Sequence, residues 1–134
     1  MVERLAVEQL SSKKNMGFKS LDVWQLSKDL TVKIYAITEN FPAKEQFGLT
    51  SQIRRSAISI ISNIAEGSAK GSNADFARFI SIAQGSIAEL EAQLIIANEI
   101  KYLDNNLFNE ICEKISIIGK MLRGLKNSIL RKSS

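Results

Sequence analysis

The chain has 134 residues, 45% of them apolar and 24% charged, which is the size and balance of a single globular domain. It contains no histidine, one cysteine (Cys112), one proline and seven glycines. This composition excludes His-based catalytic triads, cysteine-rich zinc sites and internal disulfides, and it disfavours a β-rich fold with many tight turns. The net charge of +4 belongs to the two ends, because residues 21–119 hold nine basic and twelve acidic side chains.

The N-terminal segment differs in character from the rest of the chain. Residues 11–19 are polar, so residues 1–16 read as an extension or linker outside the domain, and Met16 offers an alternative translation start. Charged residues interrupt the apolar positions of this segment, which therefore lacks the apolar core of a signal peptide. No apolar run approaches the roughly 20 residues that span a bilayer. We expect a cytoplasmic protein without a membrane partner.

Apolar residues spaced three and four positions apart predict four long helices in chain order. The helices cover about residues 21–39, 49–66, 73–102 and 105–129. Pro42 ends the first of them, because the residue before a proline avoids helical geometry. Short connections between the helices predict an all-α fold, an antiparallel up-down-up-down four-helix bundle over residues 17–129, with a basic tail at 130–134.

Local signals mark where these helices begin and end. Ser20 is the predicted N-cap of the first helix, since serine accepts a bond from the first turn. Gly67 is predicted to end the second helix as a residue in the left-handed conformation. Ser72 followed by Asp75 resembles a capping box, which predicts the start of the third helix.

The last two helices carry more apolar residues than one four-helix core requires. At about 100° per residue, five of them lie off the core seams: Ile82, Ile96, Ile100, Ile117 and Met121. A helix that is apolar on two faces is buried on two sides, so we favour a subunit interface over scattered exposed residues. The third helix also has a stripe of small residues, which fits packing inside the protomer or against another subunit equally well: Ala77, Ser81, Gly85, Ala88 and Ala92.

Two adjacent arginines on the second helix point in different directions. Arg54 lies on the flank of the apolar face, where an unpaired charge is costly. It therefore predicts an ion pair with Glu89 or Glu66 in preference to contact with RNA. Arg55 lies on a polar face, where solvation and phosphate contact are equal alternatives. Asn63 and Glu66 are predicted to tie a helix end to its neighbour, in a structural polar network with Arg54 and Glu89.

The C-terminal end is the most positive part of the chain. It carries five basic residues and no acidic one: Lys120, Arg123, Lys126, Arg131 and Lys132. The dipole of a helix also favours cations at its C-terminus, so a structural and a nucleic-acid-binding interpretation both stand. Together with Arg55, these five residues are the candidate nucleic-acid-binding residues.

Catalytic constellations are missing from the sequence. It has no Gly-rich phosphate loop, no paired thiol and no activated nucleophile, and Cys112 lies beside a core stripe as a small apolar residue. Without histidine the Glu-x-x-His pairs of a di-iron bundle are absent too, so we expect no enzyme, no cofactor and no metal. Trp24 and Tyr35, with Lys28 between them, could stack bases, but the edge of a core or an interface is favoured.

Several segments resemble one bacterial family, the four-helix-bundle proteins named after the intervening sequences of 23S ribosomal RNA genes. The segments that carry the resemblance are Phe18–Gln25, Tyr35–Pro42, Phe47–Ala57, Ser59–Gly67, Phe76–Ile80, Ala83–Ser86 and Glu89–Leu94. The resemblance covers about residues 17–125. It implies an antiparallel bundle that assembles into a ring, a homopentamer in members of known structure.

For function, the resemblance implies an association with ribosomal RNA, inferred from where some of the family's genes lie. Related small bundles act as accessory partners of a reverse transcriptase and bind nucleic acid. The leading hypothesis is therefore a non-enzymatic oligomeric scaffold that associates with ribosomal or other structured RNA, or with a nucleic-acid-processing protein. The alternative is a protein-binding adaptor that makes no contact with nucleic acid.

Overall fold

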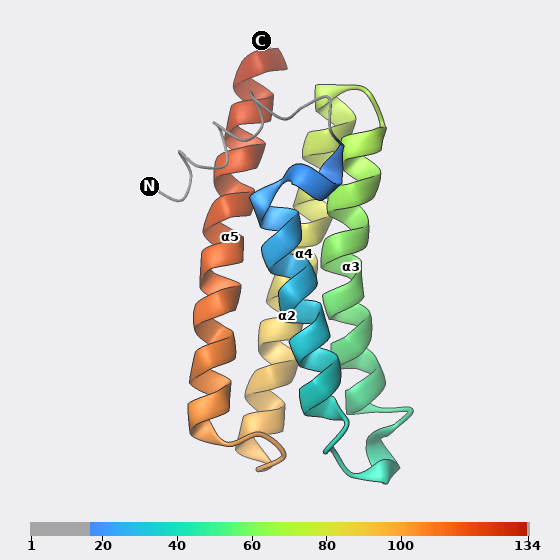
Figure 1. Ribbon diagram of the computed structural model, residues 1–134, viewed down its shortest axis with the longest axis vertical. Helices are drawn as coiled ribbons and strands as arrows, with labels where there is room; N and C mark the ends of the chain where they lie inside the picture. The colour runs from blue at the N-terminus through green and yellow to red at the C-terminus, as the bar shows by residue number, and fades with distance from the viewer. Residues whose placement is uncertain (1–16, 134) are drawn as a thin grey trace.

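The computed structural model describes residues 17–133, so the expectation for residues 1–16 lies outside the described part of the chain. The elements are η2 (Phe18–Ser20), α2 (Asp22–Thr38), η3 (Ala43–Glu45), α3 (Leu49–Ala69), α4 (Asn73–Glu99) and α5 (Asn105–Ser133). The four α-helices lie side by side and successive helices run in opposite directions (Figure 1). The predicted all-α four-helix bundle is confirmed.

Each helix contributes one buried stripe to a single core. The largest fully buried side chains come from all four helices: Leu30, Ile34, Ile53, Ile60, Ile64, Ile80, Leu90, Leu94, Ile111, Ile115, Ile118 and Leu122. Within a helix, successive members are three, four, seven or ten residues apart, which is the spacing that places side chains on one helical face. The periodicity of the sequence therefore located the core correctly.

Of the two N-caps that the sequence predicts, the structure confirms Ser72 but not Ser20. Ser20 does not cap α2, because it lies in the short turn η2 and its hydroxyl donates to the Gly17 carbonyl at 3.0 Å. Ser72 does cap α4, where the Asp75 amide donates to its hydroxyl oxygen at 3.1 Å. At α5 the Leu107 amide donates to a carboxylate oxygen of Asp104 at 2.9 Å. This helix continues to Ser133, four residues beyond its expected end.

Gly67 does not end α3, and the reason for a glycine there is different. The residue is helical and buried, and α3 continues to Ala69. A Cβ atom at this position would lie 2.7 Å from Cβ of Phe79 and 3.1 Å from Cδ1 of Phe76, both on α4. The missing side chain therefore allows α4 to approach α3 closely. The left-handed residue of this connection is Gly71, with φ of 84°.

The end of the bundle opposite this connection is held by Glu45. The Tyr102 hydroxyl donates to Oε2 of Glu45 at 2.9 Å, and the Leu49 amide donates to Oε1 at 3.2 Å. Both bonds lower the pKa of the Glu45 carboxyl, and the bond from the Leu49 amide has the larger effect. The bond to Glu45 also raises the pKa of the Tyr102 hydroxyl. The α2–α3 connection is thus tied to the α4–α5 connection, at the lower end of Figure 1.

Replacing Gly67 with alanine should destabilise the bundle, because the new methyl group overlaps Phe79. Overpacking of this kind costs about 1–3 kcal/mol in the free energy of unfolding. Gly119 is the matched control: it is also helical, but a Cβ there meets no atom within 4 Å. Gly119→Ala should stabilise by about 0.5–1 kcal/mol through helix propensity. Urea denaturation of both variants measures the two values, and equal effects would contradict the packing argument.

Replacing Tyr102 with phenylalanine should lower stability in a pH-dependent way. Because the folded pKa of Glu45 is lowered from its ordinary 4.5, its hydrogen bonds stabilise the fold above that pH and are lost as pH falls through the folded pKa. Because the pKa of the Tyr102 hydroxyl is raised from 10.0, its hydrogen bond to Glu45 stabilises the fold below that pH, and this stabilisation is lost as pH rises through the raised pKa. The variant should therefore be less stable than the wild type at pH 7 and closer to it at pH 3. Urea denaturation at the two pH values decides, and an unchanged difference would contradict this role.

Candidate interaction surfaces

The outward face of α4 carries exposed isoleucines, with polar and small residues between them. Ile82, Ile96 and Ile100 are 43%, 52% and 47% exposed, as their positions off the core seam predicted. Within residues 17–133, α4 is the one helix long and apolar enough to span a membrane, a test that core helices also pass. Only 33% of its most apolar window is buried inside the protomer. The helix therefore has a second apolar face, which the bundle leaves uncovered.

The stripe of small residues lies on this same outward side. Ala77 is buried and the Ser81 hydroxyl bonds to its carbonyl at 3.1 Å, but Gly85, Ala88 and Ala92 are exposed. A Cβ atom at Gly85 would meet nothing within 4 Å. Close packing inside the protomer, one of the two interpretations of the stripe, is therefore wrong for its three exposed members. The smooth surface that they form stays open to another molecule.

The two residues of α5 that the sequence predicts at the same interface, Ile117 and Met121, lie in different environments. Met121 is only 3% exposed and packs in the core, so its assignment to a subunit interface is wrong. Met121 lies at the border of the core stripe of α5, where it belongs to the same buried cluster as the core residues of the other helices. Ile117 is 44% exposed but lines a groove of about 280 Å³ between α2 and α5, with Leu26 and Lys33. It faces α2 and does not adjoin the exposed isoleucines of α4.

Arg54 forms the predicted ion pair, but with a different carboxylate. Its guanidinium lies 3.0 Å from Glu39, donates to the Thr38 hydroxyl at 2.8 Å and to the Tyr35 carbonyl at 3.2 Å. It also lies 4.5 Å from the centre of the Tyr35 ring. The expected partners Glu89 and Glu66 are therefore wrong, because the flank of α3 that carries Arg54 faces the end of α2 and not α4. Arg54 closes the last turn of α2 and covers Tyr35.

The proposed polar network does not exist as one unit. Asn63 donates to the Ser59 carbonyl at 2.8 Å and to the Ser59 hydroxyl at 3.0 Å, within its own helix. Glu66 lies 3.9 Å from Lys70, one turn further along α3. Glu89, on α4, joins neither of them. The four residues share a polar character and not a common face of the bundle.

The sequence reasoning missed a polar groove of about 440 Å³ between α3 and α4. Its lining consists of polar side chains only: Ser51, Gln52, Arg55, Ser56, Ser59, Ser86, Glu89 and Gln93. The hydroxyls of Ser59 and Ser86 lie 2.7 Å apart across the two helices. Oε1 of Gln93 is buried and accepts no hydrogen bond from the described residues. Serines at facing positions of two adjacent antiparallel helices are the sequence signal for such a groove. Helical periodicity describes one helix at a time, so it does not show which residues of two helices face each other.

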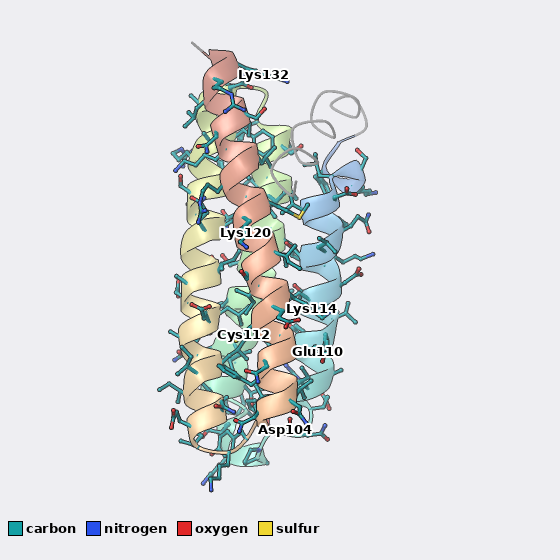
Figure 2. All side chains as sticks on the ribbon, turned by 90° about the vertical axis from the view of Figure 1, so that its left-hand side faces the viewer. Asp104, Glu110, Cys112, Lys114, Lys120 and Lys132 are labelled. Carbon is teal, nitrogen blue, oxygen red and sulfur yellow. The ribbon has the colours of Figure 1, made fainter. Side chains whose placement is uncertain are left out.

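Five of the six basic residues of α5 lie in its second half, and the sixth, Lys114, lies in its first half. Figure 2 shows Asp104 and Glu110 near the start of the helix and Lys120 and Lys132 further along. Four of the five candidates are exposed and Lys126 is half-buried.

The α3–α4 connection lies at the same end of the bundle (Figure 1). Lys70 after α3 and Arg78 in the second turn of α4 are basic residues near it that the sequence reasoning did not include, but Lys70 lies 3.9 Å from Glu66 and Arg78 lies 3.7 Å from Asp75. The basic residues in the second half of α5 therefore make this end the positive end of the described bundle.

The remaining candidates show less capacity for chemistry. Cys112 is half-buried, and burial followed by the nearby Glu91 raises the pKa of its thiol, so it stays protonated at neutral pH. Trp24 packs edge-on against Phe18, with ring centres 4.9 Å apart, at the edge of the core. Residues 17–133 contain no cluster of three side chains that could hold a metal ion.

The chain matches the family of 23S rRNA-intervening sequence proteins over residues 19–124. It is also similar to a solved structure of a protein with unknown function from the S23 ribosomal protein family of Bacteroides thetaiotaomicron VPI-5482. The two chains are 28% identical and superpose with a TM-score of 0.70, over 78% of this chain and 97% of the other. A comparison with curated proteins gives no match.

Proposed function

Because the chain belongs to the 23S rRNA-intervening sequence protein family, we propose that it is a non-enzymatic oligomeric scaffold that associates with structured RNA. The observation that carries the proposal is the uncovered face of α4. Exposed isoleucines and small residues occupy the same side of this helix, where a soluble protomer would normally expose polar residues.

Self-association is the first part of the proposal. Burying an exposed isoleucine contributes roughly 1.5–3 kcal/mol before the cost of ordering, so a few per subunit can hold an assembly together. Small residues between them let a neighbouring helix approach closely. The family resemblance supplies the number of subunits, and on that basis the proposed assembly is a homopentameric ring.

Association with RNA is the second part. The positive end consists of the basic residues in the second half of α5. Lys70 and Arg78 lie near this end, but they are paired with Glu66 and Asp75. A ring of identical subunits repeats this positive end once per subunit, and repeated weak contacts to one RNA add up to strong binding. The names of the family and of its solved relative refer to ribosomal RNA and to a ribosomal protein family. They support ribosomal RNA as the first RNA to test.

A protein-binding adaptor is the alternative. The body of the chain favours it, because residues 21–119 carry a net charge of −3, from nine basic and twelve acidic side chains. An acidic surface repels the phosphates of RNA. In this alternative the scaffold self-associates and presents its acidic body to a protein partner.

Replacing both Ile96 and Ile100 with lysine should dissociate the assembly without unfolding the helices, because both side chains are exposed in the protomer. Light scattering at micromolar concentration should report a mass near 14.9 kDa for the variant and a larger mass for the wild type. Circular dichroism should be unchanged. Val32→Lys is the matched control, since Val32 is 65% exposed on α2. A wild-type mass of 14.9 kDa would refute self-association.

Replacing Lys120, Arg123 and Lys126 with glutamine should weaken binding to 23S ribosomal RNA fragments and flatten its salt dependence. Each lost phosphate contact reduces the slope of log affinity against log salt by about 0.7–0.9, so the slope should fall by about two to three. Neutralising Lys28, Lys44 and Lys114 is the matched control and should change the slope less. If the wild type shows no binding at low salt, the RNA part of the proposal fails and the adaptor remains.

A further inference from the structure

We propose that residues 1–10 form a helix that occupies the groove between α2 and α5 of their own protomer. The inference goes beyond the proposed function, because it concerns a single protomer and holds whether or not protomers assemble. Three features support it: an open apolar groove, a segment of matching pattern and charge, and a linker that reaches this groove. The segment is then part of the domain, and the exposed face of α4 is left free for other molecules.

The groove between α2 and α5 is an open apolar surface. α2 packs less closely against α5 than the other neighbouring helices of the described bundle pack against each other. Leu30 and Ile118 lie deepest in the groove and are each 1% exposed, whereas Leu26 and Ile117 are 41% and 44% exposed. The volume of the groove is about 280 Å³. Covering these side chains with a further apolar segment removes their surface from water and is favourable.

The sequence of residues 1–10 has the pattern of a helix with one apolar side. At about 100° per residue, four apolar residues lie on that side: Val2, Leu5, Ala6 and Leu10. Gln9 is the one polar residue among them. A helix this short is marginal in water by itself and depends on packing of its apolar side. A groove between two helices supplies the surface that it needs.

One end of the groove carries a positive charge that an acidic residue of this segment can complement. Lys33 of α2 and Lys114 of α5 line the groove, and Lys33 donates to Glu110 at 2.8 Å. The hydrogen bond from Lys33 and the charge of Lys114 lower the pKa of the Glu110 carboxyl, so both cations lie near this one anion. Asp29, the acidic residue of the lining, already lies 3.7 Å from Lys28. Two cations therefore share one carboxylate at this end.

The order of residues in the segment fits the order of residues in the groove. The segment precedes α2 and joins it at its start, so inside the groove it runs antiparallel to α2. Leu26 and Lys33 are seven positions apart, as are Leu10 and Glu3, and in a helix both intervals cover about 10 Å. With Leu10 beside Leu26, the carboxylate of Glu3 lies beside Lys33 and Lys114. Glu3 is then the second anion for the two lysines.

The linker selects this groove over the other exposed apolar surface. Residues 11–16 join the segment to the described bundle, and in extended form they span at most about 20 Å. Leu26 lies only about 6 Å along α2 from its start at Asp22. Ile96 and Ile100 lie about 35–40 Å along α4 from the same end of the bundle (Figure 1), beyond the reach of the segment in one protomer.

The test is the reactivity of a thiol placed in the groove, in a full chain whose own thiol is removed by Cys112→Ser. With dithionitrobenzoate, the thiol of Ile117→Cys should react at least about tenfold more slowly than that of Val32→Cys, because a docking free energy of about 1.4 kcal/mol gives tenfold protection. Val32 is the matched control, since it is 65% exposed on α2 and does not line the groove. Adding Leu5→Asp and Leu10→Asp should abolish the protection, with circular dichroism to show that the bundle remains helical.

A charge variant tests the direction of the segment. Glu3→Lys should raise the reactivity of the Ile117→Cys thiol, because it adds a third cation beside Lys33 and Lys114. Glu8→Lys makes the same change of charge further from these lysines and should raise it less.

Each opposing outcome overturns the inference. If the Ile117→Cys thiol reacts as fast as that of Val32→Cys, the groove is open. If it is protected but the two aspartates have no effect, another surface covers it. If dilution removes the protection, the segment belongs to another copy and does not dock within its own protomer. A monomeric wild type would refute the proposed self-association and leave this inference standing, so the two failures are distinguishable.

Discussion

The close packing of α3 against α4 is the constraint on which the other surfaces depend. At one end of this helix pair Gly67 removes a side chain that would overlap Phe79, and further along the hydroxyls of Ser59 and Ser86 meet at 2.7 Å. Four of the residues that line the groove between the two helices are serines, Ser51, Ser56, Ser59 and Ser86, whose small side chains leave space there. The same arrangement turns one face of α4 fully into the core, so the other face has no helix of the protomer to cover it. The groove and the exposed face of α4 are therefore two consequences of one contact.

α4 consequently has two packing faces, one in the core of the protomer and one on its surface. The core seam is apolar throughout and includes Ile80, Leu90 and Leu94, which are fully buried. The surface face is apolar only at its ends, which are about half exposed. A fully apolar surface face would bind any helix that presented apolar residues, and would favour aggregation. Polar residues at its centre lower the affinity for wrong partners, because a mismatched partner would leave a charge buried and unpaired.

The sequence was sufficient for the core and insufficient for the polar contacts, and the difference has a physical cause. Apolar periodicity is a property of one helix, so the buried stripes could be read without knowing which helices are neighbours. The partner of Arg54 could not, because it depends on how far α2 extends beside α3. The prediction for Gly67 was wrong for the same reason. A glycine is needed there because Phe79 of α4 lies against it, whereas the prediction considered only how α3 itself ends. Met121 lies at the edge of a stripe, where a shift of one neighbouring helix decides between core and surface. The polar groove needs two helices to exist and so has no signature in either one.

The separation of charge along the molecule limits how assembly and RNA binding can be combined. The positive residues gather at the end of the bundle that holds the α3–α4 connection and the last turns of α5 (Figures 1 and 2). The exposed face of α4 runs from near that end toward the opposite one, and the groove beside it holds one basic and one acidic residue, Arg55 and Glu89. Contacts along this face would therefore bring the positive ends of neighbouring subunits near one another, where they repel each other in the absence of a polyanion. That repulsion is screened by salt and is removed when a phosphate chain binds across the subunits. On this argument RNA and subunit contacts stabilise each other even though they use different residues, and the coupling between them is electrostatic.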